Sequence, residues 1–201
     1  MNHFYKEKDR IYRLRVPFGS VYTSVFLIES DGGDVLVDCA ATADDVDRCI
    51  IPALETCGKR ISDIKYMVIS HNHKDHAGGL IRILEHAPNI EVIREVKAIS
   101  DEVQTYPRPG LTEDSIGVLD IRCHTLISPD GLQGAGVGKY RCYTQNPKSY
   151  IATLEKIKND EMIESILFSH AYEPWNKDSI IGRENVIQCL NDCLKYVKDK
   201  E

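Results

Sequence analysis

Apolar and β-branched residues near the start of the chain form three short runs that are typical of strands. The runs cover residues 11–16 (IYRLRV), 21–29 (VYTSVFLIE) and 34–38 (DVLVD), and such residues are favoured on pleated, half-buried surfaces. Turn sequences separate them, Pro17–Gly19 after the first run and Asp31–Gly33 after the second. The pattern predicts two consecutive hairpins at the start of the fold.

Helical spacing of apolar residues follows this strand region. From Thr42, which suits an N-cap, apolar residues recur at helical spacing as far as Gly58, and Pro52 implies a kink or a break inside that helix. Residues 80–87 predict a second helix. The same spacing predicts two later helices, one beginning at Asn146–Pro147 and one across 186–197.

Short apolar runs between the helices predict the remaining strands. Residues 66–70 (YMVIS) lead directly into a group of histidines, and residues 165–170 (SILFSH) end in another histidine. Further extended segments are expected at 90–93, 116–121 and 124–128. Strands at the start followed by interspersed helices predict a mixed α/β domain built in layers.

The composition narrows the classes of function. The chain has 201 residues, of which 42% are hydrophobic and 28% charged, as expected for a globular protein. We see no repeat, low-complexity tract or break in composition, so residues 1–201 are expected to form a single domain. The net charge of −6 argues against a general phosphate-binding surface, so no nucleic-acid partner is expected.

The chain is expected to be cytoplasmic, and no association with a membrane is expected. Its first sixteen residues lack the apolar region of a secretory signal. No uninterrupted apolar stretch approaches the ~18–20 residues that cross a bilayer. The seven cysteines are odd in number and scattered, which indicates reduced thiols rather than a disulfide framework.

The sequence SHNHKDHAGG at 70–79 concentrates metal-ligating side chains in one place. His71 and His73 lie two positions apart at the end of a predicted strand, where a curled backbone lets two imidazoles converge on one ion. Asp75 and His76 then project the other way and can hold a second ion nearby. Gly78–Gly79 lets the chain pass close to the site without a side-chain clash. The stretch therefore predicts a metal centre.

The HxHxDH pattern between a short apolar strand and two glycines resembles the metallo-β-lactamase superfamily of metal-dependent hydrolases. VLVDCA at 35–40 resembles the family's strand that ends in aspartate, which implies that Asp38 supports the histidine loop. TLISPDG at 125–131 implies that Asp130 bridges the metals, and ILFSHAYEPW at 166–175 implies that His170 completes the second position. The resemblance implies a four-layer αββα sandwich, somewhat shortened.

The chain departs from the family pattern at one ligand. RPGLTEDSIGVLD at 108–120 matches the turn that normally carries a further histidine, and Leu111 occupies the ligand position. His124 is the nearby substitute that we considered, although in this register it lies on the strand before the bridging aspartate. Only residues 77–110, 34 positions, separate the cluster from this turn, and the segment 93–109 is expected to be a shortened wall of the substrate pocket.

The resulting ligand sets are unequal. The first position would be left with His71, His73 and the shared Asp130, while the second keeps Asp75, His76, Asp130 and His170. Three protein ligands plus a water suffice for a catalytic Zn²⁺. Mixed histidine and carboxylate ligation suits Zn²⁺ best, with Mn²⁺ or Fe²⁺ as alternatives, and either one or two ions remain open.

The resemblance implies a hydrolase in which metal-activated water attacks a small ester, thioester, lactone or similar bond. Asp75 would orient that water or accept its proton. Glutathione thioesters are one conceivable substrate, but no residue selects them. The alternative is a degenerate, catalytically weak family member that binds a ligand or partner, for which Leu111 and the short pocket segment speak. The sequence leaves the substrate and the oligomeric state open.

Overall fold

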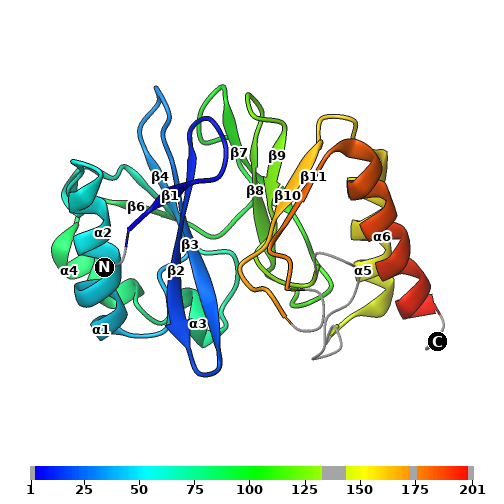
Figure 1. Cartoon of the computed structure of the whole chain (residues 1–201), viewed down its shortest axis with the longest axis horizontal. Coiled ribbons are helices and arrows are strands. Elements are labelled where there is room, and N and C mark those ends of the chain that lie inside the picture. Colours follow the sequence, from blue (N-terminus) through cyan, green and yellow to red (C-terminus); the bar gives the residue numbers. More distant parts are fainter. Residues whose placement is uncertain (1–2, 133–143, 173–175, 199–201) are drawn as a thin grey trace.

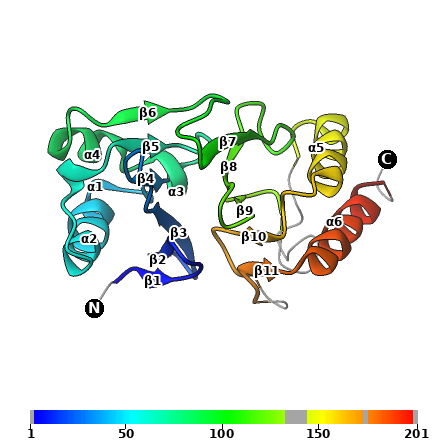
Figure 2. The ribbon, with the colours of Figure 1, turned by 90° about the horizontal axis from the view of Figure 1, so that it is seen from above.

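Two β-sheets face each other in a computed structural model, and helices cover the outer face of each sheet. The structure describes residues 3–132, 144–172 and 176–198. Figure 1 shows α1, α2 and α4 outside the first sheet and α5 and α6 outside the second; Figure 2 shows the same layers from above. The predicted four-layer αββα sandwich is confirmed.

The first sheet has six strands in sequence order. The first four strands pair antiparallel, whereas β4, β5 and β6 run parallel to one another. The strands are β1 (Tyr5–Lys6), β2 (Ile11–Phe18), β3 (Val21–Ile28), β4 (Val35–Val37), β5 (Tyr66–Val68) and β6 (Glu91–Ile93). The predicted hairpins at 11–38 therefore become β2–β3 and β3–β4.

The second sheet has five strands in the order β11-β10-β9-β8-β7. Only β9 and β10 are parallel, and every other pair is antiparallel. The strands are β7 (Val103–Pro107), β8 (Ile116–Asp120), β9 (Thr125–Ile127), β10 (Ser165–Leu167) and β11 (Ser179–Ile181).

The first predicted helix is divided into three pieces. Thr42 caps α1 by accepting a hydrogen bond from the Asp45 backbone, as its side chain suggested. A π-helical turn, η1, follows, and Pro52 stands in the first turn of α2, where a missing N–H costs nothing. The pieces are α1 (Ala43–Asp45), η1 (Val46–Ile50) and α2 (Ile51–Thr56).

The other helices flank the sheets or the histidine loop. Asn146 caps α5 by accepting from the Ser149 backbone, and a proline opens the helix. These helices are η2 (Ile61–Asp63, 3₁₀), α3 (Lys74–Ala77), α4 (Leu80–His86), α5 (Pro147–Asn159) and α6 (Arg183–Lys198). Among the described residues, none of the helices is both long and apolar enough to span a bilayer.

Segment 93–109 is not merely a pocket wall. Its last part forms β7, which pairs with β8 at the edge of the second sheet. The prediction missed it because the strand is short and ends in Pro107, a residue that is tolerated at an edge strand. The two-residue β1 and the three-residue β11 were missed because they are too short for a periodic pattern.

Arg13 ties the two sheets together near the end of the sandwich where His170 lies. It is fully buried on β2, and its guanidinium donates to the carbonyls of Phe168 (2.6 Å) and Asp178 (2.8 Å) in the second half of the chain. The Asp178 carboxylate lies 3.0 Å from the same guanidinium and accepts hydrogen bonds from Arg15 and Tyr22. The cation and the carboxylate therefore depend on each other across the sheet interface.

We expect Asp178→Asn to lower the free energy of unfolding by about 1–3 kcal/mol, less than a fully buried pair because Glu7 still faces Arg13. Burial raises the pKa of Asp178, but Arg13, Tyr22 and Arg15 outweigh it and hold the pKa below its usual value. The carboxylate thus stabilises the fold above about pH 4, and this contribution is lost as the pH falls through the lowered folded-state pKa.

Urea unfolding of both proteins between neutral and acidic pH tests this. The difference between parent and variant should be constant at neutral pH and shrink as the pH falls below about 4. A difference that stays constant down to the acid transition would contradict the role of Asp178.

Candidate metal centre

Two pairs of parallel strands, one pair in each sheet, end at the same edge of the sandwich. β4 leads to Asp38 and β5 to His71 in the first sheet, while β9 leads to Asp130 and β10 to His170 in the second. Because parallel neighbours end at the same edge, residues far apart in sequence meet there. This edge carries α3, at the bottom of Figure 1.

The histidine loop is packed directly onto the backbone that follows β4. The Cys39 N–H donates to the His76 carbonyl at 2.8 Å. A Cβ at Gly78 would lie 2.0 Å from the Ala41 carbonyl oxygen, and one at Gly79 would lie 2.2 Å from that of Cys39. Only glycine permits this approach, which places α3 and its two ligand candidates beside the strand ends.

His71, His73 and Asp130 form the first group of candidate ligand atoms. His71 Nε2 lies 2.9 Å from His73 Nδ1 and 3.6 Å from Asp130 Oδ2. All three residues offer a ligand atom within 4.8 Å of the others. The group matches the reduced first position expected from the sequence, with no third imidazole among its members.

Asp75, His76 and His170 form the second group. Asp75 Oδ2 lies 3.2 Å from the Nε2 atoms of both histidines. Asp130 connects the two groups: its Oδ1 lies 3.2 Å from His170 Nε2, and its Oδ2 lies 3.6 Å from His76 Nε2 as well as from His71 Nε2. The structure thus brings together all six side chains that the sequence proposed as ligands, with Asp130 between the groups.

Each buried histidine is oriented by a hydrogen bond from its outer ring nitrogen. His76 Nδ1 lies 2.7 Å from Asp38 Oδ2, and His170 Nδ1 lies 2.6 Å from the Tyr22 carbonyl oxygen. Ser70 Oγ donates to Asp38 and therefore accepts from His71 Nδ1, 3.0 Å away. With Nδ1 as the donor, each imidazole turns an Nε2 lone pair toward the centre, as metal-binding histidines do.

Asp38 anchors this arrangement as the sequence interpretation proposed. Its carboxylate is fully buried and accepts from the Ser70 backbone (2.8 Å), the Ser70 hydroxyl (2.9 Å) and His76. Its backbone φ of 63° is left-handed, a conformation that aspartate tolerates better than most residues. The strained turn directs the carboxylate from the end of β4 back onto the histidine loop.

The pKa of each buried histidine in the cluster reflects two opposing effects, burial and the nearby carboxylates. Burial opposes charge on His76, yet Asp130 and Asp38 raise its pKa well above the ordinary value. Burial also opposes charge on His170, but Asp130 and Asp75 raise its pKa to about 9. At His71, burial and then the charge of His76 outweigh the carboxylates and lower the pKa to about 4. The carboxylates therefore draw positive charge into the cluster.

The residues fit a divalent cation. His76 Nε2 and Asp130 Oδ1 are buried and face the centre. Each has an oppositely charged atom 3.2 Å away, on Asp75 and His170, but neither makes a hydrogen bond of good geometry within the described parts of the chain. A buried polar atom without a hydrogen bond is costly, and a cation would satisfy both. A donor set of imidazole nitrogens and carboxylate oxygens suits Zn²⁺, with Mn²⁺ and Fe²⁺ as weaker fits.

Leu111 and His124 end up in different places. Leu111 is buried, and its Cβ lies 3.5 Å from where a Cβ on Gly131 would be, so it adjoins the turn that carries Asp130. His124 lies in the turn before β9, 3.8 Å from Glu164, at the opposite end of that strand from Asp130. The suggestion that it substitutes for the missing ligand is wrong, because a strand length separates it from the cluster.

Two supports of the centre were missed by the sequence interpretation. Ser70 directly precedes His71, so its hydroxyl could have been considered. The Tyr22 carbonyl is a backbone group, and no side-chain pattern identifies it.

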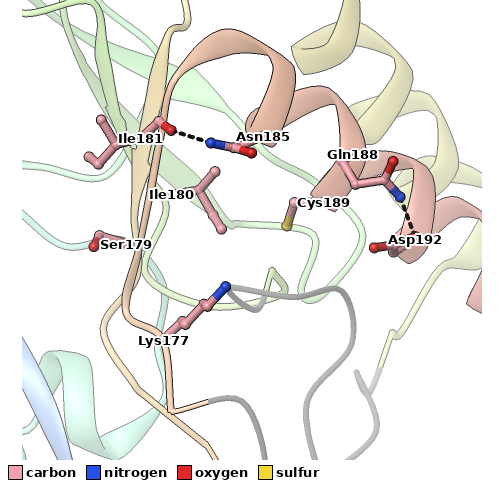
Figure 3. A pocket seen from close by; sticks show the side chains of 8 residues that line it. All are labelled: Lys177, Ser179, Ile180, Ile181, Asn185, Gln188, Cys189 and Asp192. Carbon is pink, nitrogen blue, oxygen red and sulfur yellow. Dashed lines mark hydrogen bonds between the residues drawn. The ribbon is translucent and has the colours of Figure 1, made fainter.

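A hollow of about 390 Å³ between β11 and α6 is a separate feature (Figure 3). Its polar groups are largely paired: Asn185 donates to the Ile181 carbonyl, and Gln188 donates to Asp192. None of its lining residues belongs to a candidate ligand group in the described parts of the chain. The chemistry therefore points to the strand-end cluster.

An αββα sandwich with a histidine- and aspartate-rich centre at one edge defines a class of metalloproteins. The family model described as "Metallo-beta-lactamase superfamily" matches residues 19–102. These residues include β3 to β6, Asp38 and the entire histidine loop. Over this region the chain is similar to the metallo-beta-lactamase superfamily.

Solved structures share the fold over nearly the whole chain. FIM-1 from Pseudomonas aeruginosa, in its mono-zinc form, is 15% identical with a TM-score of 0.75, covering 98% of this chain and 96% of its own. A metallo-beta-lactamase from Pontibacter korlensis is 15% identical with a TM-score of 0.72, covering 99% and 100%. At such low identity the likeness concerns the fold alone.

A curated relative is more similar in sequence over a shorter region. The cytoplasmic hydroxyacylglutathione hydrolase of Arabidopsis thaliana is 33% identical over 108 residues, which are 51% of this chain and 39% of the relative. The match thus spans less than half of the relative's length.

Proposed function

We propose that the chain is a metal-dependent hydrolase of small ester, thioester or lactone bonds, with Zn²⁺ as its cofactor. The observation that carries the proposal is the position of Asp130. Its two carboxylate oxygens face different histidines, with Oδ1 3.2 Å from His170 Nε2 and Oδ2 3.6 Å from His71 Nε2. One carboxylate between two ligand groups is the arrangement of a shared, dinuclear site.

The chain's own residues orient the attacking water and align the metal-binding imidazoles. A divalent cation, when bound, would lower the pKa of a bound water toward neutrality and polarise an acyl carbonyl. Burial raises the pKa of Asp75, but His170 and His76 outweigh it and hold the pKa well below its usual value. Asp75 therefore remains a carboxylate at neutral pH and can orient the water through a hydrogen bond. The hydrogen bonds to Ser70, Asp38 and Tyr22 keep the imidazoles aligned.

A hydroxyacyl thioester of glutathione is the first substrate to test. The similarity of the Arabidopsis hydroxyacylglutathione hydrolase, over 108 residues, supports this choice. The pocket residues that would recognise the thiol portion are not implied by that match, so esters and lactones belong in the same panel. A small-molecule substrate also agrees with a net charge of −6, which disfavours a polyanion.

The test is hydrolysis of this panel by protein loaded with zinc, stripped with a chelator, and reloaded. We expect turnover of at least one substrate, loss of turnover to the buffer level after stripping, and recovery with zinc. Zinc binding without turnover of any substrate would instead support the alternative, a catalytically weak member that binds a ligand, for which Leu111 is the observation. Turnover unaffected by complete stripping would contradict the metal-dependent mechanism.

A further inference from the structure

The turn that carries Asp130 is held from behind by a buried arginine. Arg108 precedes the Pro109–Gly110 turn, is only 4% exposed, and donates from Nη1 to the Asp130 carbonyl oxygen at 2.7 Å. Tyr150 of α5 donates to the next carbonyl, that of Gly131. Two consecutive peptide groups beside the shared carboxylate are therefore fixed by long, buried side chains.

The surrounding backbone leaves room for this arginine. A Cβ at Gly117 on β8 would lie 3.1 Å from Arg108 Cδ, so a side chain there would crowd the arginine stem. A Cβ at Gly131 would lie 3.2 Å from Arg108 Nη2, and the φ of +81° at Gly131 also favours glycine. Two glycines thus form a slot through which the guanidinium reaches the Asp130 peptide.

The segment that presents Arg108 is itself anchored. Its backbone N–H donates to the Ser115 carbonyl, and Thr153 of α5 donates to the Pro109 carbonyl at 2.7 Å. The same turn carries Leu111, which contributes no ligand. Among the described residues, the first position therefore depends on His71, His73 and Asp130 alone, and any freedom of Asp130 weakens it directly.

We propose that Arg108 is a positioning residue for the shared ligand Asp130. It fixes the peptide from which the carboxylate projects, and thereby sets the affinity of both metal positions, the three-ligand one most of all. This inference rests on the proposed function, because it assumes that Asp130 is a ligand. Hydrogen-bonding partners of ligands typically change metal affinity by about 10- to 100-fold when removed.

Zinc titration of metal-free protein against a chromophoric chelator tests this inference. Arg108→Met keeps the length of the stem and loses the donors, and Arg108→Gln keeps a shorter, uncharged amide; either variant that folds decides the outcome. We expect a loss of about 10- to 100-fold in zinc affinity, and an altered visible absorption spectrum when Co²⁺ replaces zinc. Arg108→Lys, which retains a cationic donor, should recover part of the affinity.

Thr153→Val is the matched control. It removes a hydrogen bond to the same turn without touching the Asp130 peptide, so it should lower the free energy of unfolding but change zinc affinity and the Co²⁺ spectrum much less than either Arg108 variant. Parental zinc affinity in the Met or Gln variant, or an equal loss in Thr153→Val, would overturn the positioning role. Absence of zinc binding by the parent itself would instead refute the proposed function.

Discussion

Asp130→Asn is expected to weaken zinc binding at both positions by at least about 100-fold, because losing a ligand should cost more than losing a partner of one. The amide keeps the size of the side chain but removes the charge that faces His71, His76 and His170. No other described side chain lies between the two ligand groups, so no neighbour replaces it. Metal analysis after dialysis against dilute zinc measures the effect.

His170→Ala distinguishes a ligand of one metal position from Asp130, which both positions share. This variant removes a member of the second group only. The first position keeps His71, His73 and Asp130, and the second keeps Asp75, His76 and Asp130, so weak zinc binding should remain at positions of three ligands each. Asp63→Asn, an exposed carboxylate paired with Arg60, should behave like the parent. Equal losses in the Asp130 and His170 variants would contradict a bridging carboxylate.

Leu111→His is expected to raise the zinc affinity of the first position by at least about 10-fold, since it adds a fourth protein ligand to a set of three. The residue adjoins the Asp130–Gly131 turn, and an imidazole fits the volume that the buried leucine side chain occupies. The measurement is a competitive zinc titration that resolves a weaker and a tighter phase, in which only the weaker phase should shift.

Leu111→Phe is the matched control, because it supplies a ring without a lone pair. Its titration should resemble that of the parent or be slightly weaker. If Leu111→His leaves the number of bound ions and both affinities unchanged, residue 111 is not the vacant ligand position, and the assignment of the 108–120 turn must be revised.

The histidine loop could be predicted from the sequence because its candidate ligands are close together along the chain. His71, His73, Asp75 and His76 lie within six positions, so their proximity needs no knowledge of the fold. Asp130 and His170 follow them by more than fifty residues, and they entered only through the resemblance to a family. The structure supplies the physical reason: each stands after a parallel strand that ends at the same edge.

Other features depend on tertiary packing that no periodic pattern encodes. The β7 strand contains Val103, Thr105 and Tyr106, which favour strands, but only its pairing with β8 shows that it belongs to the second sheet, and its segment was taken as a pocket wall. His124 was considered as a ligand because it is near Asp130 in sequence, yet extended chain carries it to the other end of β9. Arg108 is a surface residue by type, and its burial depends on the space above Gly117.

We propose a metal centre with one four-ligand and one three-ligand position that share Asp130. It can be tested by titration of the metal-free protein with zinc, combined with elemental analysis of the same sample. We expect two ions per chain at saturation, bound in two phases, with the tighter ion lost last on chelation. A chain that binds no zinc, or two ions that bind with equal affinity, would contradict it.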